Sequence, residues 1–298
     1  MAGFNQPREI GVAQYVTLHI EEVGDGTDPL PRTRGEFPGS AATLDADGRL
    51  ETGLLAAMVD GIGGMTSGLA SLPDWIVTTN LAVRRADDAL VGSRGTGPLV
   101  IDVRVLRRGR SSVVTRGDVA SEAGDAVATF WLTCAVLTPE GGPPSFERPV
   151  ARLERIVPDE PIFRAPPAQF FGLEAGDRPG EVLLLPQPRL RNPWGIIHGG
   201  ATAVALDTAA RGLVTDTTDP GAATDAIVTD LVVHYLSPGR VGPLVARATA
   251  VDDGPVSGRD DRLVRVEVHD IGADDRPVAL AMTTVRRLDR SAGRVTDR

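Results

Sequence analysis

The sequence repeats itself at an offset of about 150 residues, and this repeat constrains the fold more than any other feature. Three pairs of features recur in one order in the two halves: Asp60 and Asp207 at an offset of 147, Thr79-Asn80-Leu81 and Thr229-Asp230-Leu231 at 150, and Gly97-Pro-Leu-Val100 and Gly242-Pro-Leu-Val245 at 145. Offsets that agree within a few residues rarely arise by chance. The chain is therefore predicted to consist of two copies of one unit.

Each copy is predicted to contain a strand, a long helix and four further strands. Apolar residues recur at helical spacing over residues 50–65 in the first copy and 199–213 in the second. Alternating apolar runs follow the helices at 75–83, 98–106, 111–119 and 126–137, and at 226–235, 243–251, 263–268 and 278–288. Short turns between these runs favour an antiparallel meander. One helix on one sheet leaves a long sheet edge open, so two copies side by side would cover each other, as in a homodimer.

The regions outside these patterns set the predicted domain limits. Residues 15–20 alternate and predict a strand, whereas residues 24–49 are rich in Gly, Pro and Asp and predict a loop. Many prolines mark 138–168 as a linker, with one short helix near 150–156, and a strand or two is expected between 170 and 185. We therefore expect an α+β fold with an N-terminal unit over 1–137, the linker, and a C-terminal unit over 169–298.

Composition argues against several classes of protein. The formal net charge of −9, without a block of Lys and Arg, argues against a nucleic-acid-binding protein. The first residues lack the basic-then-apolar pattern of a signal peptide, and no apolar run approaches the roughly 20 residues of a membrane span. The single cysteine, Cys134, lies in an apolar run and is expected to be a buried core thiol. We expect a cytoplasmic protein without a nucleic-acid or membrane partner.

The stretch from Asn192 to Asp207 is the clearest candidate site. Turn-forming residues lead to His198-Gly199-Gly200, and a helical pattern begins there. The first N–H groups of such a helix lie bare at the positive end of its dipole, which suits a partly negative oxygen. Asp207 follows about two turns later. An ordinary glycine-rich loop with a solvent-facing aspartate remains an alternative interpretation of these residues alone.

With the repeat, this stretch resembles the hotdog-fold thioesterases. The shared features are a helix followed by four antiparallel strands, an Asn six residues before His-Gly-Gly and an Asp nine residues after the His. The resemblance is greatest to the phenylacetate-degradation (PaaI-like) group of acyl-CoA thioesterases and covers about residues 190–288, with a looser match in the first half. It implies a double hotdog: two antiparallel sheets, each wrapped around one long helix and paired as a pseudo-dimer.

The resemblance also implies a site shared between opposite units. The carbonyl oxygen of an acyl-CoA would bind the Gly199 N–H, an Asp carboxylate would act as nucleophile or general base, and Asn192 would help to place the carbonyl or a water. His198 would shape the turn, with proton chemistry ranked lower. The complete site would then combine Asp60 with Asn192, His198 and Gly199.

The second site is expected to be degenerate. Counting back from Asp60 places Glu51, Thr52 and Gly53 at the positions of His198, Gly199 and Gly200, and Asp45 at that of Asn192. Asp207 would face Asp45 and Glu51, and such crowded carboxylates raise one another's pKa. A different alignment of residues 36–50 would instead bring Asp207 into the working site. Some relatives carry a Ser that assists the Asp at the position of Val228, where Thr229 is the nearest hydroxyl.

The remaining hypotheses concern two arginines, cofactors, two alternative functions and the oligomeric state. Arg108 and Arg110 are candidates to bind the phosphates of coenzyme A, although a solvated turn explains them as well. No metal site and no cofactor are expected beyond the coenzyme A of the substrate. A hotdog acyl-CoA hydratase or dehydratase and a non-catalytic acyl-ligand-binding protein are the alternatives to an acyl-CoA thioesterase. A homodimer of the double hotdog chain is a further expectation.

Overall fold

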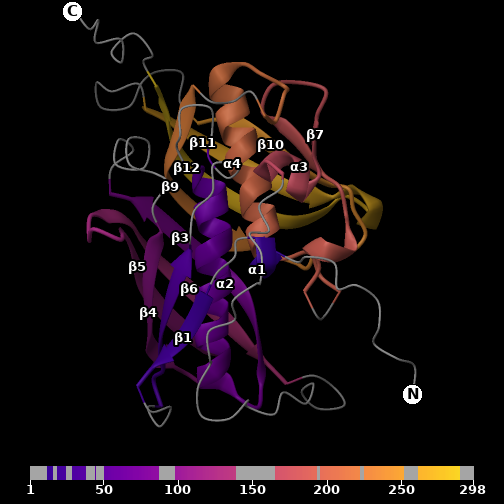
Figure 1. Cartoon of the computed structure of the whole chain (residues 1–298). Coiled ribbons are helices and arrows are strands. Elements are labelled where there is room, and N and C mark those ends of the chain that lie inside the picture. The colour runs from indigo at the N-terminus through magenta and orange to yellow at the C-terminus, as the bar shows by residue number, and fades with distance from the viewer. Residues whose placement is uncertain are drawn as a thin grey trace, which may run out of the picture.

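One antiparallel sheet of twelve strands forms the frame of the protein in a computed structural model (Figure 1). The residues that it describes are 12–15, 19–24, 29–37, 44, 50–86, 98–138, 165–192, 195–221, 225–251 and 261–288. In order across the sheet the strands are β1 (His19–Val23), β2 (Arg32–Phe37), β4 (Leu99–Arg108), β5 (Ser112–Ser121), β6 (Ala126–Leu137), β3 (Trp75–Arg85), β9 (Ala226–Tyr235), β12 (Arg276–Arg287), β11 (Asp261–Asp270), β10 (Leu244–Ala250), β8 (Glu181–Leu184) and β7 (Leu173–Ala175). The helices are α1 (Val12–Tyr15), α2 (Thr52–Ser71), α3 (Pro167–Phe171) and α4 (Gly199–Thr215), with 3-10 turns η2 (Pro188–Leu190) and η3 (Ile271–Ala273).

The two halves meet where β3 pairs with β9, so the prediction of two separate sheets is corrected to one continuous sheet. Ala82 pairs with Val232 at the centre of this junction. Asn80 bonds to His234 at one end, and Arg84 forms an ion pair with Asp230 at the other. From this junction outward, the strand order is matched on both sides. The edge that each half would leave open alone is thereby closed by the other half.

Three other predictions need correction in the first half. β3 pairs with β6 and not with β4, so the four strands after α2 do not form a simple meander. β2 lies within the segment predicted to be a loop. Its buried residues are Thr33, Gly35 and Phe37, and only one of them is large and apolar, so the sequence shows no clear alternation. The predicted strand over 15–20 is divided between the end of α1 and the start of β1. Most of the predicted linker, including the short helix near 150–156, lies outside the described residues, and the domain limits stay a prediction.

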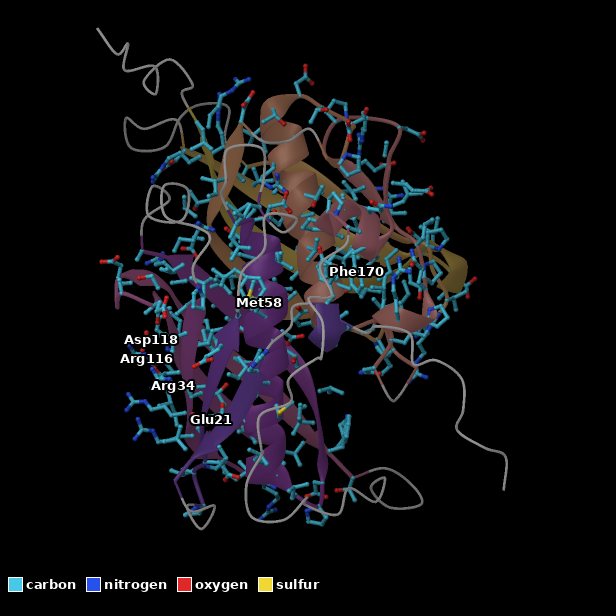
Figure 2. All side chains as sticks on the ribbon, in the orientation of Figure 1. Glu21, Arg34, Met58, Arg116, Asp118 and Phe170 are labelled. Carbon is cyan, nitrogen blue, oxygen red and sulfur yellow. The ribbon has the colours of Figure 1, made fainter. Side chains whose placement is uncertain are left out.

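Both long helices lie on the same face of the sheet (Figure 1). Their inward sides form one continuous core with the sheet, and Met58 lies near its centre (Figure 2). By length and mean hydropathy α2 could span a membrane, contrary to the sequence-based expectation, but 67% of the qualifying window is buried inside the molecule. Such burial accounts for its apolar character, because a core helix that is covered on several sides needs no polar face.

Two glycines let α2 and α4 approach each other closely. A Cβ at Gly200 would lie 2.7 Å from the Cα of Ala57, and a Cβ at Gly53 would lie 2.8 Å from the Cα of Val204. Both contacts are with backbone, which cannot move aside as a flexible side chain can. Ala57 and Val204 are 147 residues apart, as are Gly53 and Gly200. The crossing therefore joins matching points of the two helices and brings the start of each close to the middle of the other.

Candidate active site

The candidate site begins where α4 starts. His198 is the N-cap of this helix, and its Nδ1 accepts a hydrogen bond from the Gly200 N–H at 3.0 Å. Asn192 lies in the preceding turn, where its side-chain oxygen accepts a hydrogen bond from the Ile196 N–H at 3.1 Å. The Ile197 N–H donates to the Gly239 carbonyl at 2.9 Å, which ties this turn to the loop after β9. These contacts fix the approach to the helix from both sides.

Asp60 comes from the middle of α2 and reaches the first turn of α4. Its Oδ2 accepts a hydrogen bond from the Gly200 N–H at 3.0 Å and lies 3.3 Å from His198 Nδ1. Its Oδ1 accepts a hydrogen bond from the Thr78 hydroxyl at 2.8 Å. The side chain is only 4% exposed. A carboxylate from one half is therefore held against the positive end of a helix from the other half.

A further backbone donor at the start of α4 is the Gly199 N–H. Among the described residues, none accepts a hydrogen bond from it. A Cβ at residue 199 would lie 3.0 Å from Asp60 Oδ2 and 3.2 Å from Cζ of Tyr235, so a side chain here would crowd both groups. An unused backbone donor beside a carboxylate is the arrangement that acyl transfer requires, with one group for the oxyanion and one for the attacking oxygen.

The structure places Asp60, His198 and Gly199 close together and Asn192 at the adjacent turn, and their roles stay a prediction. Glu51 is the N-cap of α2, as His198 is of α4, so the N-caps of the two helices match as the repeat predicts. Asp45, the predicted counterpart of Asn192, lies outside the described residues.

The matching location around Asp207 is filled by a buried arginine. Arg211 Nε donates to Asp207 Oδ2 at 2.8 Å, and its terminal nitrogen Nη2 lies 2.9 Å from Glu51 Oε1. Burial disfavours the charged guanidinium, but the attraction of Glu51 and Asp207 outweighs this effect and raises the pKa of Arg211 above its usual value. The predicted picture of uncompensated, crowded carboxylates is therefore corrected, because Arg211 lies between them. The spacing of Asp207 and Arg211, four residues apart in a helix, is the signal that would have identified this pair.

The hydroxyl partner of the aspartate comes from the first half. From the sequence, the hydroxyl partner was expected near Val228 and Thr229 in the second half, whereas Thr78 donates the hydrogen bond to Asp60. Thr78 precedes Val228 by 150 residues, so the two occupy matching positions. Thr229 instead donates to the Thr284 carbonyl at 3.3 Å. The repeat offset, applied from Val228 back to the first half, would have found Thr78.

The two arginines proposed for coenzyme A differ in their surroundings. Arg108 Nε donates to the Ala70 carbonyl at the end of α2 at 3.2 Å, and a terminal nitrogen lies 3.8 Å from Asp74. Arg108 therefore has structural partners. Arg110 is exposed in the turn between β4 and β5. Cys134, the predicted core thiol, is fully buried, and burial is the main cause that raises its pKa to about 12. A thiol held in this form is a poor nucleophile.

Comparison with known proteins adds a family and a fold to this geometry. A model of the thioesterase superfamily matches residues 195–258, which include α4, β9 and β10. A search of curated proteins finds no match.

Solved structures give the fold. An acyl-CoA thioesterase II from Mycobacterium marinum is 14% identical with a TM-score of 0.54, over 95% of this chain and 100% of that chain. The TesB protein of Mycobacterium avium subs paratuberculosis is 13% identical with a TM-score of 0.57, over 93% and 98%. A 12:0-ACP thioesterase from Umbellularia californica is 8% identical with a TM-score of 0.57, over 86% and 94%. At such low identity this likeness shows the fold alone.

These findings do not single out the PaaI-like group that the sequence favoured. They do confirm the broader resemblance to hotdog-fold thioesterases. The chain is a hotdog-fold protein in which residues 195–258 match the thioesterase superfamily.

Proposed function

We propose that the chain is an acyl-CoA thioesterase with one working site, shared between its two halves. The observation that carries the proposal is the contact of Asp60 on α2 with the Gly200 N–H at the start of α4. The thioesterase-superfamily match over the same helix supports a thioester hydrolase. Coenzyme A belongs to the substrate, and a thioester on an acyl carrier protein presents the same pantetheine arm and carbonyl.

The proposed reaction uses the two sides of the helix start. The thioester carbonyl oxygen accepts a hydrogen bond from the Gly199 N–H, and this bond strengthens as negative charge develops on that oxygen. Asp60 accepts a proton from a water whose oxygen bonds to the carbonyl carbon. Collapse of the tetrahedral intermediate expels the thiolate, which takes up a proton, and leaves the carboxylic acid. Asp60 attacking the carbonyl directly is the nucleophilic form of the same arrangement.

The roles of the neighbouring residues follow from their contacts. Thr78 and the Gly200 N–H each hold one oxygen of the Asp60 carboxylate, which fixes its direction. His198 caps the helix when Nδ1 is unprotonated, and a proton on Nδ1 would turn its contact with Asp60 into an ion pair. Asn192 fixes the shape of the turn before α4, and this turn would help to place the carbonyl or the water. We keep Arg110 as the better of the two candidates for a phosphate of coenzyme A.

We further propose that the two halves form a pseudo-dimer of hotdog units in which the second site is structural. Arg211 is buried between Asp207 and Glu51 and pairs with both, so a substrate would have to displace a buried ion pair to reach Asp207. Two double hotdog chains are proposed to associate as a homodimer.

The test is thiol release from short, medium, long and aryl acyl-CoAs and from an acyl carrier protein thioester. Asp60→Asn should lower kcat/KM at least about 100-fold, because it removes the proton acceptor. Asp207→Asn is the matched control at the same place in the other helix. It should keep the activity but lose about 3 kcal/mol of stability, because Arg211 loses a buried partner.

Each outcome of this test has a distinct meaning. Activity lost in Asp207→Asn alone, at a temperature where both variants are folded, would show that the working site uses Asp207 and not Asp60, contrary to our proposal. A wild-type protein that hydrolyses none of these thioesters would reject the thioesterase and favour a hydratase or an acyl-binding protein.

A further inference from the structure

Tyr235 contacts the start of α4 at Gly199, where a Cβ would lie within 3.3 Å of both the Tyr235 hydroxyl and Asp60 Oδ2. It is the last residue of β9, and its hydroxyl donates to the Gly199 carbonyl at 2.9 Å. Its ring lies against the Cα of Gly199, as the close approach of a Cβ at that residue shows. The sequence includes Tyr235 in the segment that carries the family resemblance but gives it no role.

One peptide group links Tyr235 to Asp60. The Gly199 carbonyl and the Gly200 N–H belong to the same planar unit. Tyr235 donates to the oxygen of this unit, and the N–H of the unit donates to Asp60 Oδ2 at 3.0 Å. A donor on the oxygen polarises the amide and strengthens the N–H as a donor, because hydrogen bonds in a chain reinforce one another. The tyrosine also fixes the plane in which that N–H points.

The matching position in the first half holds a different residue with a different effect. Arg85 precedes Tyr235 by 150 residues and ends β3 as Tyr235 ends β9. Its guanidinium donates to the Leu50 carbonyl at 2.8 Å and to the Thr52 hydroxyl at 3.2 Å, both at the start of α2. The two strands thus each support the start of one helix. The proposed working site has a neutral phenol there, and the filled site has a cation.

We propose that Tyr235 is a positioning residue that holds the Gly199–Gly200 peptide, and through it Asp60, in the geometry for thioester hydrolysis. This inference rests on the proposed function for its kinetic part. A neutral donor suits the role, because a cation at this place would pair with Asp60 directly. Burial, and next the negative charge of Asp60, raise the pKa of Tyr235 well above its usual value, so the phenol keeps its proton.

Three titratable groups on three elements lie around Asp60, and they define what a pH profile can report. His198 is at the cap of α4, Tyr235 is on β9 and Cys134 is on β6. The phenol and the thiol both keep their protons at neutral pH, because the pKa of each is raised. A change in the pH profile near neutral pH therefore does not come from the phenol or the thiol.

The test is Tyr235→Phe, which removes one hydroxyl and keeps the ring. The matched control is Tyr15→Phe, because the Tyr15 hydroxyl also donates to one backbone carbonyl, that of Ala165, at 2.9 Å. With an acyl-CoA thioester that the wild type hydrolyses, Tyr235→Phe should lower kcat about tenfold, the worth of one hydrogen bond. KM should change less than about twofold, and the acid limb of the profile should move to higher pH.

A second readout needs no substrate. In protein labelled with ¹⁵N-glycine, the Gly200 amide resonance reports the two groups that accept its hydrogen bond, Asp60 Oδ2 and His198 Nδ1. The part of its pH titration that is absent in Asp60→Asn is that of the carboxylate. Tyr235→Phe should move that titration to higher pH, and Tyr15→Phe should leave it unchanged. A Tyr235→Phe variant that matches Tyr15→Phe in kcat and in the Gly200 titration would overturn the inference. Should the wild type hydrolyse no thioester, the proposed function fails, and the amide titration still decides whether Tyr235 positions Asp60.

Discussion

At the scale of single residues, one difference between the proposed working site and the filled one is whether the space beside the aspartate is open. Gly64 lies one helical turn after Asp60, and a Cβ there would meet only Ile76, at 3.9 Å. Arg211 lies one turn after Asp207, and its side chain is the ion-pair partner of that aspartate. Gly64 and Arg211 are 147 residues apart, so they are counterparts. A glycine in the middle of a helix costs about 1 kcal/mol relative to alanine, and here it leaves the space beside the carboxylate open.

Gly64→Arg should therefore copy the filled site into the working one. The new guanidinium would reach Asp60 across one turn, as Arg211 reaches Asp207, and kcat/KM should fall at least about 100-fold. The free energy of unfolding should not fall, because arginine favours a helix more than glycine does. Thiol release and urea unfolding measure the two effects. Gly68→Arg is the control, since a Cβ there has no neighbour within 4 Å. Equal activity in the two variants would contradict the assignment.

The residues that the sequence could and could not identify differ in a physical way. Asp60, His198 and Gly199 were predictable, because glycines at a helix start and an aspartate at fixed spacing follow from the chain itself. Thr78 and Tyr235 act across space, from strands whose register with the helices no local pattern gives. Arg211 was visible as a helical neighbour of Asp207, but its pairing with Glu51 depends on how α2 and α4 cross.

At the scale of elements, a buried aspartate ties the loop after β9 to the approach to α4. Asp270, at the end of β11, accepts hydrogen bonds from the backbone N–H groups of Arg240, Val241 and Gly242 at 2.9, 2.9 and 2.7 Å. The same loop supplies the Gly239 carbonyl that accepts from Ile197, directly before His198. Burial raises the pKa of Asp270, but these three donors, with attraction from Arg276, outweigh burial and lower it.

The lowered pKa predicts how the stability supplied by Asp270 depends on pH. The contribution is fully present above the ordinary aspartate pKa of about 3.9 and is lost as the pH falls through the lower folded value. Asp270→Asn should thus reduce the free energy of unfolding by about 2 kcal/mol at pH 7, and by less as the pH falls below about 4. Urea unfolding across this range measures the difference. Asp118→Asn, at a side chain that is 61% exposed, should show almost none of it. A deficit that stays constant with pH would rule out the charge as its cause.

Periodicity predicted the two long helices well because each buries a broad apolar face over many turns. The short elements were harder to predict. β2 has one large apolar side chain, and α1 is four residues long, so neither produces a periodic signal. The pairing of β3 with β6 and β9 is set by contacts far apart in the chain, which alternation along one strand does not encode.

At the scale of the whole molecule, the face of the sheet turned away from the helices has an apolar centre at the junction of the halves. The row Trp131, Ala82, Val232 and Met282 crosses β6, β3, β9 and β12 in register. Trp131 is 41% exposed and Met282 is 37% exposed. Charged pairs flank the row, with Arg116 beside Asp118 and Arg265 beside Glu267. Figure 2 shows Arg116 and Asp118 projecting away from α2. An apolar centre between pairs of both signs is self-complementary, as a twofold interface requires.

The proposed homodimer should form through this row. Sedimentation velocity of the wild type at micromolar concentration should give the mass of two chains. Trp131→Glu should give the mass of one chain, because it places a charge in the apolar row that the dimer would bury. Val23→Glu, on the edge strand β1 at a side chain that is 43% exposed, should leave the dimer intact. A wild-type protein with the mass of one chain would exclude the association.

The pairing of β3 with β9 within a single chain has a consequence for how such a protein can change over generations. In a dimer of identical subunits, every substitution appears at both sites at once, and neither can lose its chemistry alone. Here the partners are encoded separately, so Tyr235 and Arg85, or Gly64 and Arg211, can differ while the sheet between them stays paired. One of the two matching aspartate sites can then serve the proposed hydrolysis, and the other can hold the two halves together.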